Sequence, residues 1–197
     1  MVVVDPDVRR RELAEAVWRV VLRDGLIGAS VRNVAREAGL SMGSLRHYFG
    51  SQAELLSFSL RLVGERTTAR LRALDVTAPP RELIEQVVHA VLPLDEETRR
   101  ETQIWLAFLG AELTTRGLSK LNDEVYDGLR HLFGLVIQAL VEANLVRPEL
   151  DLEQETQRLH ALVDGLAVHA VTRPDRMPAD QVKALLAHHL EELCEPT

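Results

Sequence analysis

Apolar residues recur every three or four positions along most of the chain, a spacing that places them on one face of an α-helix. Leu13, Val17, Val20 and Val21 form the first such run, and there is no matching supply of the alternating runs typical of strands. Glycines, prolines and capping residues divide the pattern into nine predicted helices. These span residues 8–24, 31–38, 42–49, 51–75, 80–92, 96–116, 118–144, 152–173 and 178–193. We therefore expect an all-α protein.

Residues suited to helix ends support these boundaries. Serine and aspartate side chains can accept the first free backbone N–H groups of a helix, and glycine tolerates the left-handed conformation that ends one. Gly25 and Gly39 follow two predicted helices, and Ser51 with Glu54 has the spacing of a capping box. The predicted N-terminal caps are Asp7, Ser30, Ser41, Ser51, Asp95 and Asp151.

Composition indicates a folded protein of the cell interior. Hydrophobic residues make up 46% of the 197 positions, enough for the core of one ordinary domain plus a small one. The single cysteine, Cys194, cannot form a disulfide within its own chain. No signal-like segment opens the chain, and no run of about 18 apolar residues is uninterrupted. We expect a cytoplasmic protein without a membrane span.

Charge is distributed unevenly along the chain. The net charge of −7 argues against a protein that coats nucleic acid indiscriminately, because that mode requires phosphate neutralisation. Residues 1–50 contain 8 Arg against 6 Asp and Glu, whereas residues 51–197 contain 15 Lys and Arg against 24 Asp and Glu. The two parts are expected to differ in electrostatic role, although an excess of two charges also arises by chance.

Residues 31–49 have the pattern of a helix-turn-helix, two short capped helices joined through Gly39, Leu40 and Ser41. Ala35 is small enough for the second helix to cross closely, and Gly39 permits a tight turn. Two short helices around a glycine turn also occur in bundles that never touch nucleic acid. The outward-facing residues therefore decide between the two interpretations.

The predicted outward face of the second short helix favours DNA. It carries Met42, Ser44, Arg46 and His47. Arg46 can bond guanine edges or phosphate, Ser44 can bond either, and His47 and Tyr48 can reach phosphate oxygens. A helix that only needs to be soluble more typically has Glu and Lys there.

The segment GLSMGSLRHYFGSQAELL, residues 39–56, resembles the signature of the TetR family of transcriptional regulators. The family usually has Tyr where Arg46 stands and Lys where Gln52 stands. Residues 99–108 (RRETQIWLAF) and 162–167 (LVDGLA) resemble the BetI-type branch, which includes choline-responsive repressors and whose ligands vary widely.

The resemblance implies a homodimeric, ligand-responsive repressor that binds a palindromic DNA operator. Residues 1–50 would form the DNA-binding domain and residues 51–197 the effector-binding and dimerisation domain, with the helix from residue 51 linking the two. The predicted DNA-binding residues are Ser30, Arg32, Ser41, Met42, Ser44, Arg46, His47, Tyr48 and Gln52.

One helix face in the C-terminal part suits a small effector. Trp105, Leu109 and Glu112 are spaced i, i+4 and i+7, so an indole, an aliphatic group and a carboxylate share a face that suits a cationic or polar ligand. The alternative is that Trp105 belongs to the core and Glu112 is solvated. The effector-binding candidates are Arg66, Trp105, Phe108, Leu109, Glu112, Tyr126, Phe133, Asp164 and His169.

Broad apolar stripes on the last two predicted helices indicate either core or a dimer interface. In the TetR family the corresponding pair builds a four-helix dimer interface, and reading a two-fold operator requires a two-fold regulator. The predicted interface residues are Leu159, Leu162, Gly165, Leu166, Val182, Leu186 and Leu190.

Catalytic and metal chemistry has little support in the sequence. His160 and Asp164 have i, i+4 spacing, but no third ligand stands at a convincing distance. The chain has no nucleophile–base pair and no Gly-rich phosphate loop. We expect no enzyme, cofactor or metal. The rival interpretations are a helical small-molecule binding protein or enzyme without DNA binding, and a transcriptional activator of the same fold.

Overall fold

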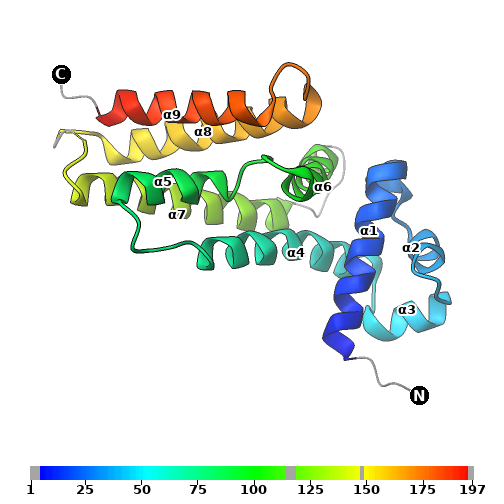
Figure 1. The fold of residues 1–197 in the computed structure, drawn as a ribbon. Coiled ribbons are helices and arrows are strands. Elements are labelled where there is room, and N and C mark those ends of the chain that lie inside the picture. The colour runs from blue at the N-terminus through cyan, green and yellow to red at the C-terminus, as the bar shows by residue number, and fades with distance from the viewer. Residues whose placement is uncertain (1–4, 114–118, 147–148, 195–197) are drawn as a thin grey trace. The chain divides into compact units, whose positions relative to one another are not determined.

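The structure, a computed structural model, describes residues 5–113, 119–146 and 149–194. Within these residues the chain forms nine helices and no strand, which confirms the all-α prediction. The predicted end of the sixth helix at residue 116 and start of the seventh at residue 118 lie outside the described residues. The helices are α1 (Pro6–Gly28), α2 (Val31–Glu37), α3 (Met42–Tyr48), α4 (Gln52–Arg72), α5 (Pro80–His89), α6 (Glu96–Glu112), α7 (Ser119–Glu142), α8 (Leu152–Thr172) and α9 (Ala179–Cys194) (Figure 1).

The chain divides into two compact units. Unit 1 comprises Met1–Arg66 and Gln103–Asn122, and unit 2 comprises Thr67–Thr102 and Asp123–Thr197. Helices α4, α6 and α7 therefore contribute residues to both units. The domain boundary expected after residue 50 stays a prediction.

Serine and aspartate caps begin several helices as the sequence predicts. The Ser30 hydroxyl accepts the backbone N–H of Asn33 at 3.3 Å at the start of α2. The Ser41 hydroxyl accepts the N–H of Ser44 at 3.0 Å at the start of α3. Equivalent bonds at the starts of α4, α6 and α8 are accepted by Ser51, Asp95 and Asp151.

Two helix starts differ from the prediction. Asp5, not Asp7, caps α1, because Pro6 occupies the first helical position, where its missing N–H costs no hydrogen bond. The Glu54 carboxylate accepts the backbone N–H of Gly50 at 2.9 Å instead of that of the capping serine. The reciprocal bond of the expected capping box is therefore shifted by one residue.

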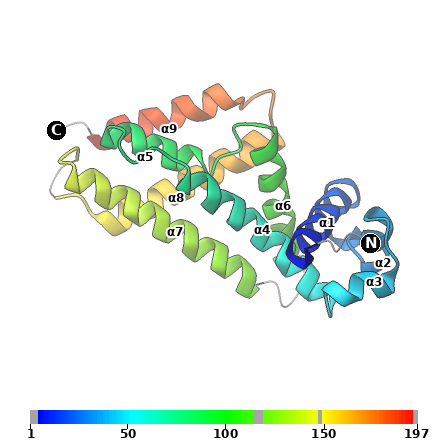
Figure 2. The same ribbon diagram turned by 60° about the horizontal axis from the view of Figure 1, so that its bottom comes forward.

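In unit 1, α2 and α3 lie beside α1 (Figures 1 and 2). Gly25 interrupts the helical geometry of α1 with φ +73, at the point where the predicted first helix ends. The indole N–H of Trp18 donates to the Ser59 carbonyl at 2.9 Å and joins α1 to α4. The buried residues of α1 are Leu13, Ala14, Ala16, Val17, Trp18, Val20 and Val21.

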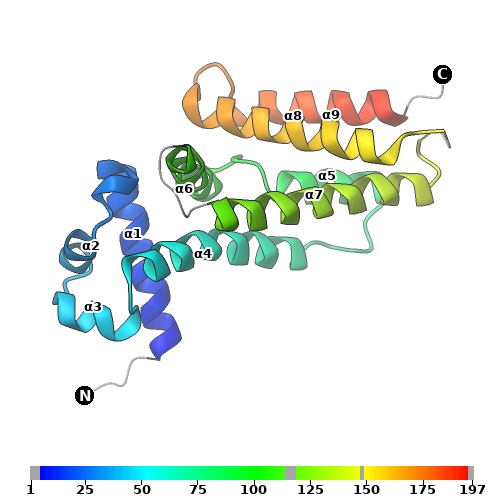
Figure 3. The same cartoon turned by 180° about the vertical axis from the view of Figure 1, so that it is seen from behind.

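In unit 2, α8 and α9 lie side by side and run antiparallel (Figures 1 and 3). Their inward faces join α5 and α7 in one hydrophobic core. Among the described residues, no helix is both long and apolar enough to cross a membrane. The buried residues of this core are Ile84, Val88, Leu92, Phe133, Val136, Ile137, Leu140, Leu159, Val163, Leu166, Ala170, Val182, Leu186, Leu190 and Leu193.

Candidate DNA-binding and effector sites

The turn between α2 and α3 has the tight geometry that the sequence predicts. Gly39 adopts φ +66, a left-handed conformation that glycine enters without strain. Its N–H donates to the Arg36 carbonyl at 3.1 Å, and the N–H of Leu40 donates to the Ala35 carbonyl at 2.8 Å. These bonds close the turn and set the direction in which α3 leaves it.

Helix α3 is held from its buried side. Leu45 and Phe49 are almost completely buried, and the Phe49 ring lies 5.4 Å from the Phe58 ring, centroid to centroid. The Arg10 guanidinium lies over both rings, at 4.6 and 4.8 Å from their centroids, and pairs with the Glu54 carboxylate at 3.2 Å. The sequence does not single out Arg10, because its partners lie far along the chain and no local pattern marks them.

The opposite face of α3 is open to solvent. Met42, Ser44, Arg46 and His47 are exposed, as predicted for a face that reads DNA. Tyr48 is half-buried, and its ring meets the His47 ring edge-on, with centroids 5.6 Å apart and planes at 80°. The face therefore presents one cation, one hydroxyl and two rings with polar atoms.

Other predicted DNA-binding residues already have roles within the chain. The Ser30 and Ser41 hydroxyls cap α2 and α3, although each keeps capacity for a further bond. The Gln52 side-chain amide donates to the Ala29 carbonyl at 3.0 Å and holds the start of α4 against the residue that follows α1. Arg32 is exposed. DNA contact by these four residues stays a prediction.

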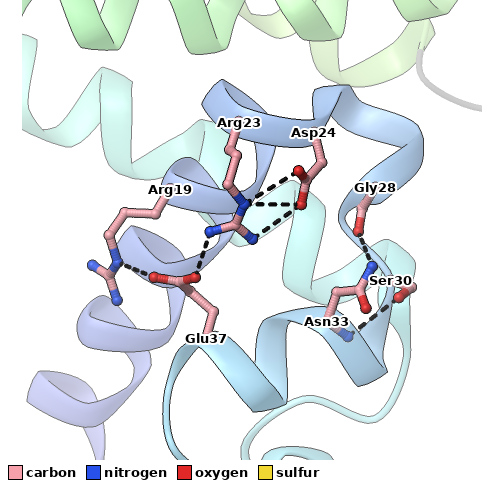
Figure 4. Close-up of polar contacts among 7 residues, drawn as sticks. All are labelled: Arg19, Arg23, Asp24, Gly28, Ser30, Asn33 and Glu37. Atoms are coloured by element: carbon pink, nitrogen blue, oxygen red, sulfur yellow. Dashed lines mark hydrogen bonds and ion pairs between the residues drawn. The ribbon is translucent and has the colours of Figure 1, made fainter.

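A polar network joins α1 to α2 (Figure 4). The Glu37 carboxylate accepts from Arg19 Nε and from an Arg23 terminal nitrogen, each at 2.8 Å. These bonds, that of Arg23 first, hold the pKa of Glu37 below its usual value. Arg23 also pairs with Asp24 at 3.0 Å, and the Asn33 amide donates to the carbonyl of the last α1 residue at 2.9 Å. The sequence shows charges here but not which of them pair.

Five effector candidates lie in unit 1. Trp105 and Glu112 are half-buried and Leu109 is exposed, so the three residues of the predicted face keep surface for a ligand. Phe108 has no exposed surface and belongs to the core. The Arg66 guanidinium lies 4.7 Å from the ring centroid of Trp18 and pairs with Glu15 on α1, so it has structural partners.

Asn122 is a polar residue of unit 1 that the sequence did not single out. Its side-chain nitrogen donates to the Glu112 carboxylate at 2.6 Å and lies 3.5 Å from the Phe108 carbonyl. The residue is 6% exposed, and its side-chain oxygen has no hydrogen-bond partner. A buried acceptor without a donor is costly, and the bond from the Asn122 nitrogen fixes the position of the Glu112 carboxylate.

The other four effector candidates lie in unit 2. Tyr126 and Phe133 pack on the ring of buried His160, with centroid distances of 4.8 and 5.2 Å. The Asp164 carboxylate is 3.6 Å from His160 Nε2, and burial raises its pKa. His169 is exposed on the last turn of α8. Among the described residues, no group of three or more metal-ligating side chains is placed to hold an ion.

Most of the predicted dimer contacts are core residues in the structure. Five of them, Leu159, Leu166, Val182, Leu186 and Leu190, lie buried in the hydrophobic core of their own chain. Leu166 is 4% exposed and the other four are 0% exposed, so these side chains have little or no surface with which to contact a second chain. Leu162 and Gly165 are half-buried and keep some surface. An interface made by α8 and α9 stays a prediction and would use their outward faces.

A helix-turn-helix whose second helix has an exposed polar face, joined to a larger helical part, is the arrangement found in DNA-binding regulators of transcription. The chain matches the family described as bacterial regulatory proteins of the TetR family over residues 13–57. Residues 80–195 match the family described as BetI-type transcriptional repressor, C-terminal. The protein belongs to the TetR family and is a transcriptional regulator of the BetI-type branch.

Known relatives agree over nearly the whole chain. The regulator PksA of Bacillus subtilis is 41% identical over 97% of this chain and 92% of its own. A transcriptional regulator of Rhodococcus sp. Rha1 has a TM-score of 0.79 at 30% identity, covering 93% of this chain and 95% of that one. A regulator of Saccharomonospora viridis, solved in complex with choline, shares the fold. Its TM-score is 0.78 at 24% identity, and the match covers 94% of this chain and 96% of that one. All three are described as transcriptional regulators.

Proposed function

We propose that this regulator represses transcription in the cytoplasm by binding a palindromic operator as a homodimer and that a small effector weakens this binding. The observation that carries the proposal is the exposed face of α3. Ser44, Arg46 and His47 are turned outward while Leu45 and Phe49 anchor the helix in the core. A recognition helix needs this arrangement, because base contacts require side chains held in fixed positions.

Selection of bound duplexes from a random pool tests the proposal. The expected result is enrichment of a palindrome, whereas a protein with a merely structural helix pair enriches nothing. Arg46→Ala should weaken binding to the enriched duplex, by about 1–3 kcal/mol if Arg46 contacts a base edge, and should relax its sequence preference. Placing the enriched site in a promoter then separates repression from activation by the direction of change in reporter expression.

The outward faces of α8 and α9 support a dimer built on this helix pair. Ala161, Gly165 and Val168 follow one another at i, i+4 and i+7 on α8, and Ala184 and Ala187 share a face of α9 at i and i+3. A Cβ placed on the glycine meets nothing within 4 Å, so a second helix has room to approach closely. Small residues permit such close packing, and the two-fold symmetry of a dimer built this way would match the two-fold symmetry of a palindromic operator.

Charge insertion distinguishes this interface from the core. Ala161→Glu or Ala184→Glu should give folded monomers in sedimentation experiments, since an unpaired charge in an apolar interface is unfavourable. Ala69→Glu makes the same change at an exposed position of α4 and should leave the dimer intact. Leu186→Asp should instead unfold the chain, because Leu186 is 0% exposed. Dimers that survive both α8 and α9 substitutions contradict the proposed interface.

The effector site that we propose is the helix face formed by Trp105, Leu109 and Glu112 in unit 1, with buried Asn122 holding the Glu112 carboxylate from behind. Glu112 supplies an acceptor and negative charge, and the Trp105 indole offers a cation–π face. This combination suits a small organic cation. Choline, which the Saccharomonospora viridis protein binds, is the first probe for this chain.

Thermal stabilisation by choline, by tetramethylammonium and by neutral 3,3-dimethylbutanol tests the cation site. The two cations should stabilise the wild type, and Glu112→Gln should lose this response while Glu124→Gln, which removes an exposed charge, should keep it. Occupancy should lower operator affinity by roughly 5–150-fold, and operator should weaken cation binding by the same factor. Equal responses of wild type and Glu112→Gln place the effector elsewhere.

A further inference from the structure

The arginines of the first three helices fall into two groups. Between residues 5 and 50 there are eight, and five of them have carboxylate partners in ion pairs. All five are on α1. The paired arginines are Arg9, Arg10, Arg11, Arg19 and Arg23. The other three, Arg32, Arg36 and Arg46, are exposed and have no ion pair with any residue that the structure describes.

All three unpaired arginines are on α2 and α3. The only acidic residue between positions 25 and 53 is Glu37, and its carboxylate is already bonded to Arg19 and Arg23 of α1. Glu37 therefore forms no ion pair with Arg32 or Arg36 of its own helix. The surface of α2 and α3 keeps an excess of positive charge, although the whole chain carries a net charge of −7.

Arg36 lines a surface pocket at the polar network that joins α1 to α2. The pocket has a volume of about 400 Å³ and is lined by Arg23, Asp24, Asn33, Arg36 and Glu37. Both carboxylates of this pocket are bonded to Arg23 (Figure 4). Arg36 is the cation of the pocket that has no carboxylate partner among the described residues, and it stands one helical turn beyond Arg32.

We infer that Arg36 binds a phosphate of the DNA backbone, so that Arg32 and Arg36 form a second line of contact along α2 beside the face that α3 presents to the bases. The inference rests on the proposed DNA binding. A long, exposed and unpaired guanidinium suits a phosphate, because it donates several hydrogen bonds without first having to leave a carboxylate. Such a contact positions the protein without reading sequence.

Salt-dependent binding to two duplexes tests the inference. One duplex carries the sequence enriched from the random pool, and the other has the same length and an unrelated sequence. Arg36→Ala should reduce the slope of log affinity against log salt by about 0.9, which is about a fivefold loss at about 0.15 M relative to 1 M salt. The loss should be equal on both duplexes, and Arg36→Lys should recover most of it.

Arg61→Ala is the matched control. Arg61 is also exposed without an ion pair to a described residue, but it stands in the middle of α4, so the variant removes the same charge away from α2 and α3. It should keep the wild-type slope. Equal slopes for Arg36→Ala and wild type overturn the role of Arg36 while leaving the proposed function intact, and so does a loss confined to the enriched duplex. A wild type that binds neither duplex refutes the proposed function itself.

Discussion

Replacing Gly39 with alanine measures what the turn between α2 and α3 requires of the backbone. Gly39 has φ +66, in the left-handed region that costs an L-residue roughly 1–2 kcal/mol. A Cβ at this position meets no heavy atom within 4 Å, so no steric clash adds to that cost. Alanine also restricts the unfolded chain, which offsets about 0.4–1 kcal/mol. Gly39→Ala should therefore lower the free energy of unfolding by about 1 kcal/mol.

Gly64→Ala is the control, and it should change the free energy of unfolding in the opposite direction. Gly64 lies inside α4 without a positive φ, and a Cβ there also meets nothing within 4 Å. Alanine at such a position should stabilise the helix by about 0.5–1 kcal/mol. Both substitutions change the unfolded chain in the same way. The difference between the two variants, about 1.5–2 kcal/mol, therefore reports the folded backbone alone.

Urea unfolding followed by the fluorescence of Trp18 provides the assay. Trp18 is 7% exposed in unit 1, and a Trp105→Phe background removes the other indole signal. With a slope of about 2 kcal/mol per molar urea, Gly39→Ala should lower the midpoint by about 0.5 M. A midpoint at or above that of the background protein would refute the argument from the positive φ. A loss far above 2 kcal/mol would reveal a clash that the structure does not contain.

Two further predictions concern pH. The pKa of Glu37 is held low by Arg23 and Arg19, so its contribution to stability is present above its ordinary value near 4.5 and is lost as the pH falls through the lowered one. Glu37→Gln should show a smaller loss of stability below pH 4.5 in acid-dependent melting experiments, and an unchanged acid profile contradicts this. Burial raises the pKa of Asp164, so its charge becomes unfavourable to folding as the pH rises from 3.8 through the raised value. Asp164→Asn should raise the melting temperature at pH 7 but not at pH 3.5, and a lower value at pH 7 contradicts the assignment to burial.

Elements that depend on local chemistry were predictable from the sequence. The caps at Ser30 and Ser41 and the turn at Gly39 stand where the spacing places them, because each needs only neighbours within a few residues. The predicted cap of α1, Asp7, was wrong by two residues, although Pro6 indicates the correct position. Proline is favoured at the first helical position, so the residue before it is the cap.

Contacts between distant segments were not predictable from one sequence. Arg10 meets Glu54 across 44 positions, and which of many charges pair depends on how the helices pack. The apolar stripes of α8 and α9 correctly marked burial, but periodicity does not say which chain covers a stripe. Leu186 and Leu190 are covered by their own chain, which moves the proposed dimer contacts to the smaller residues on the outward faces.

The arrangement of charges also explains how an acidic protein can bind DNA. At physiological salt, charges separated by more than about 8 Å are largely screened, so binding depends on the groups next to the phosphates. The pairing of Arg19 and Arg23 with Glu37 neutralises α1 locally and leaves Arg32, Arg36 and Arg46 as the cations of α2 and α3. Few unpaired cations imply a shallow salt dependence and weak binding to unrelated DNA. Discrimination between DNA sequences must then come mainly from the base contacts that we propose for α3.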